Sequence, residues 1–149
     1  MNRKINKVAV IGSGVMGSGI ACHFANIGVE VLLLDISPTK LNENEEKLGL
    51  SLEDKKVKNR IVNEMFQRCI KSKPAPLYHK NFSKRVELGN LTDDLKKISN
   101  VDWIIEVVTE KLNIKQDPRI DSLLKTKIEN DRERFRTTYF TLQLYSVCI

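Results

Sequence analysis

The sequence predicts an α/β fold in which helices cover both faces of a doubly wound parallel sheet. Four short runs rich in apolar and β-branched residues lie within residues 1–108, and segments with helical spacing separate them. Runs without a regular polar alternation are typical of parallel strands that are buried on both faces. The alternation of such strands with helices indicates a parallel sheet built from right-handed crossovers.

The first strand, helix and second strand follow one another closely. Residues 7–11 form an apolar run, and the expected helix over 15–27 places Val15, Ile20, Phe24 and Ile27 at helical spacing before it stops at Gly28. The run EVLLLDI at 30–36 is the second strand. These 36 residues therefore form a βαβ unit.

The later elements are less regular in sequence. We expect a polar, solvent-facing segment that begins a helix over 38–47, followed by an amphipathic helix over Val57–Ile70 that ends at the turn KPAP. After this turn we expect a strand over Arg85–Leu88, a helix over Leu91–Ile98 and a strand over Val101–Val108.

Composition bounds the class of protein. A chain of 149 residues with 41% hydrophobic residues suits one globular domain. It has no apolar stretch long enough to span a membrane, and the start MNRKINK has no leader pattern, so we expect a cytoplasmic protein. The three cysteines, Cys22, Cys69 and Cys148, have no metal-ligand spacing, so we expect reduced thiols and no bound metal.

The net charge of +6 is concentrated in one segment. Residues 55–85 hold ten Lys or Arg and a single acid, Glu64. Such a run is either a solvated surface or an attractor of anions. Aromatic residues are not interleaved with it and no nucleic-acid motif is present, so we expect no nucleic-acid partner.

The most specific motif is G-x-G-x-x-G, formed by Gly12, Gly14 and Gly17 between the expected first strand and first helix. There, Gly12 would turn the chain, Gly14 would admit a pyrophosphate and Gly17 would bring the helix close to the strand. The helix N-terminus would offer free N–H groups to the phosphates. The alternative is that these glycines serve only turns and packing.

An acid follows the motif at the end of the second strand. Asp35 lies where a carboxylate would accept hydrogen bonds from ribose hydroxyls and would repel a 2′-phosphate, which predicts NAD rather than NADP. The alternative is that Asp35 only caps the next helix. The residues expected to contact the dinucleotide are Gly12, Ser13, Gly14, Val15, Met16, Gly17 and Asp35.

Beyond this motif, two segments resemble a known family. GSGVMGSGIA, followed by HFANIGVEVLLLDI, resembles the Rossmann-type N-terminal domain of the 3-hydroxyacyl-CoA dehydrogenases. DWIIEVVTEKLNIK resembles the segment in which an acid and a lysine approach the nicotinamide ribose, here Glu110 and Lys115. These two residues could instead form an ordinary surface ion pair. Residues 48–80 are similar to the longer version of this region found in bacterial β-oxidation proteins with an enoyl-CoA hydratase module.

The resemblance implies NAD-dependent oxidation of a 3-hydroxyacyl-CoA, with a carboxylate-oriented histidine taking the hydroxyl proton. It also implies that the intact parent acts on an acyl-CoA substrate. Lys71 and Lys73 would attract the phosphates of the coenzyme A. Two alternatives remain open. One is a fragment of a 3-hydroxyacid or 6-phosphogluconate-type dehydrogenase, which shares the glycine pattern more loosely, and the other is a non-catalytic dinucleotide-binding module.

The resemblance covers residues 1 to about 116 and stops there. We therefore divide the chain into a dinucleotide-binding part, 1–116, and a divergent tail, 117–149. The family's later strand and catalytic histidine are absent from the tail, which makes the predicted sheet incomplete. The tail could form a substitute αβ pair, with a helix from Asp117 and a strand over Tyr139–Val147, or it could be a shifted reading frame.

Neither histidine, His23 nor His79, matches the family's catalytic position, so no catalytic residue is assigned. We expect the isolated chain to bind NAD weakly or not at all and to lack dehydrogenase turnover. An apolar surface left without its usual neighbours could also drive self-association.

Overall fold

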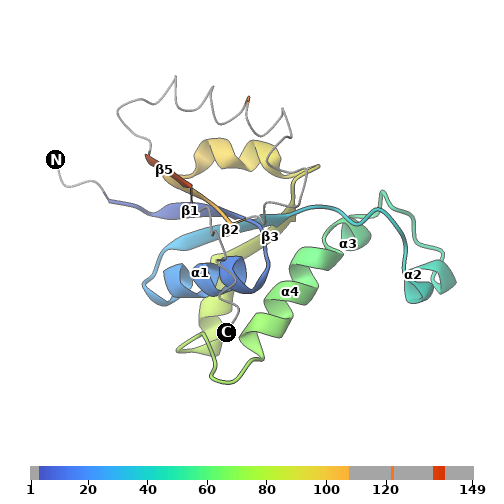
Figure 1. Cartoon of the computed structure of the whole chain (residues 1–149), viewed down its shortest axis with the longest axis horizontal. Coiled ribbons are helices and arrows are strands. Elements are labelled where there is room, and N and C mark those ends of the chain that lie inside the picture. The colour runs from blue at the N-terminus through green and yellow to red at the C-terminus, as the bar shows by residue number, and fades with distance from the viewer. Residues whose placement is uncertain (1–3, 108–121, 123–135, 140–149) are drawn as a thin grey trace, which may run out of the picture.

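The computed structural model describes residues 4–107, 122 and 136–139 (Figure 1). Its centre is a five-stranded parallel sheet with the strand order β3-β2-β1-β4-β5. The chain therefore begins in the middle of the sheet, extends it to one side and then crosses to the other. The strands are β1 (Lys7–Ile11), β2 (Glu30–Asp35), β3 (Val86–Asn90), β4 (Trp103–Glu106) and β5 (Arg136–Tyr139).

Both faces of the central strands are buried, which explains their continuous apolar sequences. In β1, Val8 and Val10 point into one hydrophobic cluster, whereas Ala9 and Ile11 point into another. The helices α1 (Val15–Asn26) and α4 (Arg60–Ile70) cover the first face, and the 3₁₀ helix η2 (Leu95–Asn100), drawn in yellow, covers the second (Figure 1). The predicted doubly wound α/β fold is confirmed.

The segment between β2 and β3 differs from its prediction in detail. The expected helix over Val57–Ile70 is divided into α3 (Lys55–Lys58) and α4, with Asn59 between them at φ −92° and ψ 6°. The Asn59 side-chain oxygen accepts a 2.7 Å hydrogen bond from Asn90, which accounts for a polar residue at this buried junction.

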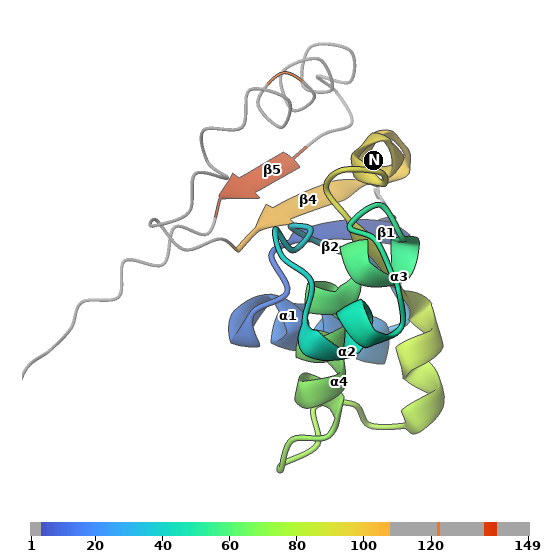
Figure 2. The same cartoon turned by 90° about the vertical axis from the view of Figure 1, so that its right-hand side faces the viewer.

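Short elements flank this region. The helix α2 (Glu43–Lys47) begins with a capping box in which Asn42 and Glu45 bond each other's backbone N–H groups. Figure 2 shows α2 and α3 close together in front of α4. An unexpected 3₁₀ helix, η1 (Lys80–Arg85), precedes β3, with the His79 side chain accepting a hydrogen bond at its start.

After β3, the expected helix over Leu91–Ile98 is replaced by a turn and the later helix η2. The chain makes a single helix-like turn here, in which the Asp94 N–H donates to the Asn90 carbonyl and the Asp94 side chain accepts the Asn90 N–H, before η2 begins at Leu95.

At the opposite edge, β5 pairs in parallel with β4 (Figure 2). The sequence predicts the tail strand over Tyr139–Val147, whereas the observed strand ends at Tyr139. Residues 140–147 lie outside the described residues, as does the expected tail helix except for Ser122. Within the described part of the chain, every helix is too short or too polar to cross a membrane.

Candidate functional site

The glycine turn joins β1 to α1 at the carboxyl edge of the sheet. Gly12 has a φ of +102°, a left-handed conformation that favours glycine, and its N–H donates to the Leu34 carbonyl at 2.8 Å. A Cβ on Gly17 would lie 1.8 Å from the Gly12 carbonyl oxygen. The first turn of α1 therefore packs directly on the backbone of the glycine turn, as the motif predicts.

Gly14 precedes the helix and leaves its N-terminus open. It occupies the N-cap position of α1, and a Cβ there would meet no atom within 4 Å. The first helical turn contains no acidic residue, and its N–H groups have no intrahelical acceptors. Val15 and Met16 are 87% and 51% exposed. The arrangement suits a bound anion such as a pyrophosphate.

Asp35 ties the end of β2 to the glycine turn. Its Oδ2 accepts the Ser13 N–H at 2.6 Å and also the Ser13 hydroxyl, while its Oδ1 accepts the Ile36 N–H at 2.7 Å. Ser13 is fully buried and Asp35 is half-buried. A carboxylate offers about four acceptor positions, so one remains for a ribose hydroxyl. Asp35 does not cap the next helix, because Asn42 caps α2.

Ser13 also forms a hydrogen bond with Ser18, which the sequence did not reveal. Its carbonyl accepts the Ser18 hydroxyl at 2.6 Å, and Ser18 is itself buried in the first turns of α1. Hydrogen bonds thus hold the glycine turn to β2 through Asp35 and to α1 through Ser18. The signal available in the sequence was serine beside glycine at two places in GSGVMGSG.

An apolar groove of about 450 Å³ adjoins the first turn of α1 and runs toward β4. Phe24 and Trp103 meet edge-to-face with ring centroids 5.8 Å apart, and the buried Trp103 Nε1 has no hydrogen-bond partner among the described residues. The groove is lined by Val15, Met16, Gly19, Ile20, His23, Phe24, Trp103, Ile105 and Val107.

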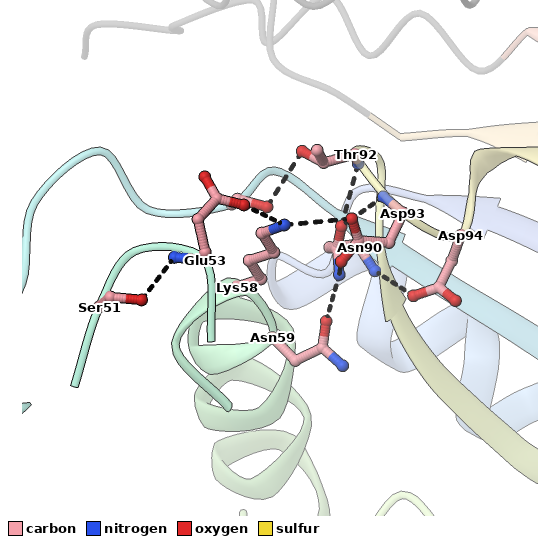
Figure 3. A network of polar contacts seen from close by, with 9 residues as sticks. Ser51, Glu53, Lys58, Asn59, Asn90, Thr92, Asp93 and Asp94 are labelled. Carbon is pink, nitrogen blue, oxygen red and sulfur yellow. Dashed lines mark hydrogen bonds and ion pairs between the residues drawn. The ribbon is translucent and has the colours of Figure 1, made fainter. Parts of the chain in front are cut away.

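A polar network beyond the end of β3 was not foreseen either (Figure 3). Asn90 is fully buried, its Nδ2 donates to Asn59, and its Oδ1 accepts the N–H groups of Thr92 and Asp93 at 3.0 and 2.8 Å. Leu91 N–H donates to the Asp35 carbonyl at 2.9 Å. The network therefore holds the chain that leaves β3 against the end of the strand bearing Asp35.

Lys58 closes the outer side of this network by pairing with Glu53 at 2.8 Å and Asp93 at 3.2 Å (Figure 3). The hydrogen bonds that Lys58 donates to these two carboxylates, chiefly the one to Glu53, raise the pKa of Lys58. A cation so neutralised is not free to attract a phosphate.

The structure does not bring every predicted site residue to the glycine turn. Lys71 and Lys73 are exposed and follow α4. The chain just beyond them contacts the C-terminal end of α1, where Asn26 donates to the Pro76 carbonyl at 2.8 Å. The glycine turn lies at the other end of α1. Glu110 and Lys115 lie outside the described residues.

The histidines lie away from the carboxyl edge of the central strands. His23 is exposed in the third turn of α1, and His79 is exposed at the start of η1. Among the described residues, no cluster of three or more His, Cys, Asp or Glu side chains could hold a metal ion.

Comparison with known proteins agrees with this geometry. The sequence pattern of the 3-hydroxyacyl-CoA dehydrogenase NAD-binding domain matches residues 7–126. A Bacillus subtilis (strain 168) protein named "Probable 3-hydroxyacyl-CoA dehydrogenase" is 49% identical over 116 residues, which are 78% of this chain and 15% of that protein. A Deinococcus radiodurans protein of the same name is 42% identical over 114 residues, 76% of this chain and 29% of that protein.

A solved structure shares the fold. The dehydrogenase part of multifunctional enzyme 1 from C. elegans superimposes with a TM-score of 0.54 at 21% identity, over 95% of this chain and 27% of that one. The chain thus spans less than a third of the length of these relatives. The matched sequence pattern extends over most of the chain, and the chain belongs to the family of 3-hydroxyacyl-CoA dehydrogenase NAD-binding domains.

Proposed function

We propose that this chain is the NAD-binding part of an enzyme that oxidises 3-hydroxyacyl-CoA to 3-oxoacyl-CoA in fatty acid β-oxidation. NAD is the cofactor of the family's domain. The observation that supports the proposal most directly is the contact between Gly17 and the Gly12 carbonyl, because it sets the open N-terminus of α1 beside the glycine turn. The family match favours this activity over the other dehydrogenases that share the glycine pattern.

The residues of the turn would hold the dinucleotide by complementary charge and shape. The first-turn N–H groups of α1, from Val15 and Met16 onward, would bond the pyrophosphate, and the open space at Gly14 would admit it. Asp35 would use its remaining acceptor position for a ribose hydroxyl, and its charge disfavours a 2′-phosphate. When bound, the nicotinamide supplies the acceptor of the substrate hydride.

The isolated chain is expected to lack turnover, since proton transfer from the substrate hydroxyl needs a base within hydrogen-bond reach of it. His23 and His79 sit on α1 and before η1, and the Nδ1 of His79 accepts the Asn81 N–H. Neither is placed beside the glycine turn. Alone, the chain is expected to bind NAD weakly or not at all.

The remaining proposals concern ligands and location. Acyl-CoA is the substrate class of the intact parent, with Glu110 and Lys115 near the nicotinamide ribose and Lys71 and Lys73 toward the phosphates of coenzyme A. The exposure of Lys71 and Lys73 supports their part. Self-association through an exposed apolar surface and a cytoplasmic location remain predictions from the sequence.

Titration of NADH fluorescence tests the cofactor site. We expect weak binding of NADH by the full 149-residue chain and still weaker binding of NADPH. Asp35→Ala should weaken NADH binding, whereas Glu46→Gln, which neutralises an exposed acid of α2, should leave it unchanged. Equal NADH affinity for Asp35→Ala and wild type would remove the ribose assignment. NADH-dependent reduction of a 3-oxoacyl-CoA by the purified chain would show that catalysis needs no further segment.

A further inference from the structure

Two cysteines face each other across the interface between α1 and α4. Cys22 on α1 is fully buried in the hydrophobic cluster of that face, and Cys69 on α4 packs against the same cluster while remaining partly exposed. The Cys69 side chain lies close enough to Cys22 to influence its pKa, and both are free thiols. No other described feature of the site uses either sulfur.

The environment makes the two thiols unequal. Burial raises the pKa of Cys22 to about 12, and the neighbouring Cys69 adds to the effect. Cys22 therefore keeps its proton, and its sulfur is shielded from solvent, whereas the Cys69 side chain is partly exposed. Because a soluble oxidant reaches the exposed sulfur, Cys69 is the thiol that it meets first.

We propose that Cys22 and Cys69 form an oxidative modification site, at which a peroxide oxidises Cys69 and Cys22 then closes a disulfide between α1 and α4. In the first step the Cys69 thiolate attacks one peroxide oxygen. The O–O bond breaks, Cys69 becomes a sulfenic acid and, after proton uptake, one water leaves when the oxidant is hydrogen peroxide. The sulfur loses two electrons and the peroxide gains them.

In the second step the Cys22 sulfur attacks the Cys69 sulfenic sulfur. The S–S bond forms, the S–O bond breaks, and the Cys22 proton leaves with the hydroxyl as water. Contact between the two side chains replaces the diffusion of a second thiol.

The cross-link would join residues 22 and 69 and so form a covalent loop that contains β2 and the segment that follows it. A disulfide across a loop of this size restricts the unfolded chain, which stabilises the folded state. We therefore expect the oxidised protein to melt at a higher temperature than the reduced one, and a reductant such as dithiothreitol to reverse the shift.

The test uses the full chain carrying Cys148→Ser, because Cys148 lies outside the described residues and would confuse the thiol count. Hydrogen peroxide should lower the number of free thiols from two to none, and non-reducing peptide mapping should find residues 22 and 69 in one linked peptide. Two thiols that persist at an excess of peroxide, or a disulfide only between two chains, would overturn the proposal.

Single variants separate the two steps. In Cys22→Ala the sulfenic acid should persist at Cys69 and react with dimedone, whereas Cys69→Ala should leave Cys22 unmodified and show no peroxide-induced rise in melting temperature. Dimedone labelling of Cys22 in Cys69→Ala would contradict the order of the steps. If Cys22→Ala fails to fold, Cys22→Val, which keeps an apolar side chain of similar size, replaces it.

Discussion

Gly17→Ala tests the contact that positions the cofactor site. The new Cβ would begin 1.8 Å from the Gly12 carbonyl oxygen and 2.9 Å from its carbon, and it must reach at least 3.0 Å from both. Both atoms belong to the backbone, so no side chain can swing away. Either α1 retreats from β1, or the turn at Gly12 is rebuilt.

The size of the effect follows from two opposing contributions. Forcing a methyl into a packed backbone contact costs about 3 kcal/mol, the upper part of the usual range. Alanine is favoured over glycine inside a helix by about 1 kcal/mol. The variant should therefore lose about 2 kcal/mol of unfolding free energy, which for a chain of this size lowers the melting temperature by roughly 4–8 °C.

Two glycines of the same region serve as matched controls. At Gly19, inside α1, an added Cβ meets nothing within 4 Å, so Gly19→Ala should be neutral or stabilising by up to about 1 kcal/mol. At Gly14 the space is also open, so Gly14→Ala should cost less than about 1 kcal/mol. Its methyl, however, would occupy the space proposed for the pyrophosphate.

The assay pairs urea or thermal unfolding followed by circular dichroism with titration of NADH fluorescence. We expect Gly17→Ala to lose both stability and NADH binding, Gly14→Ala to lose mainly NADH binding, and Gly19→Ala to lose neither. If Gly17→Ala unfolds at the same urea concentration as Gly19→Ala, the close approach of α1 to the glycine turn does not determine this site, and the reasoning fails.

Three further predictions concern the polar contacts. Arg60→Met removes the ion pair with the buried Glu45 between α4 and α2 and should cost roughly 2–4 kcal/mol in urea unfolding; a cost below about 0.5 kcal/mol would show that the pair is not formed. Asn90→Ala leaves the buried Asn59 side-chain oxygen without its partner and the Thr92 and Asp93 N–H groups without acceptors; it should cost roughly 2–4 kcal/mol, with faster hydrogen exchange at the turn after β3. A hydrogen bond from Lys97 lowers the pKa of Glu87, so its contribution is present above the unfolded pKa and lost as pH falls through the folded pKa. Lys97→Ala should therefore reduce the loss of stability on acidification. If the unfolding free energy of Lys97→Ala falls with decreasing pH as steeply as that of the wild type, the pairing is contradicted.

Much of the fold and of the glycine turn could be predicted from the sequence, because their signals are local. The apolar runs of β1 and β2 are enough to indicate that both faces of these strands are buried. The left-handed backbone at Gly12 and the close contact at Gly17 each require a glycine at that one position. The spacing of the motif also places Asp35 at the carboxyl end of the neighbouring strand. Family membership follows from the same local segments.

Only the tertiary structure decided which distant side chains meet. Asp35 accepts hydrogen bonds from Ser13, Asn59 lies between two helices and pairs with Asn90, and the buried Cys22 lies near Cys69, which is 47 positions along the chain. Each pairing depends on how helices lie on the sheet and on strand register, which are set by the packing of the whole core rather than by the periodicity of any one segment. The sequence by itself therefore determined a βαβ unit with a dinucleotide turn, and the packing of α1 and α4 on the sheet decided the contacts that brace it.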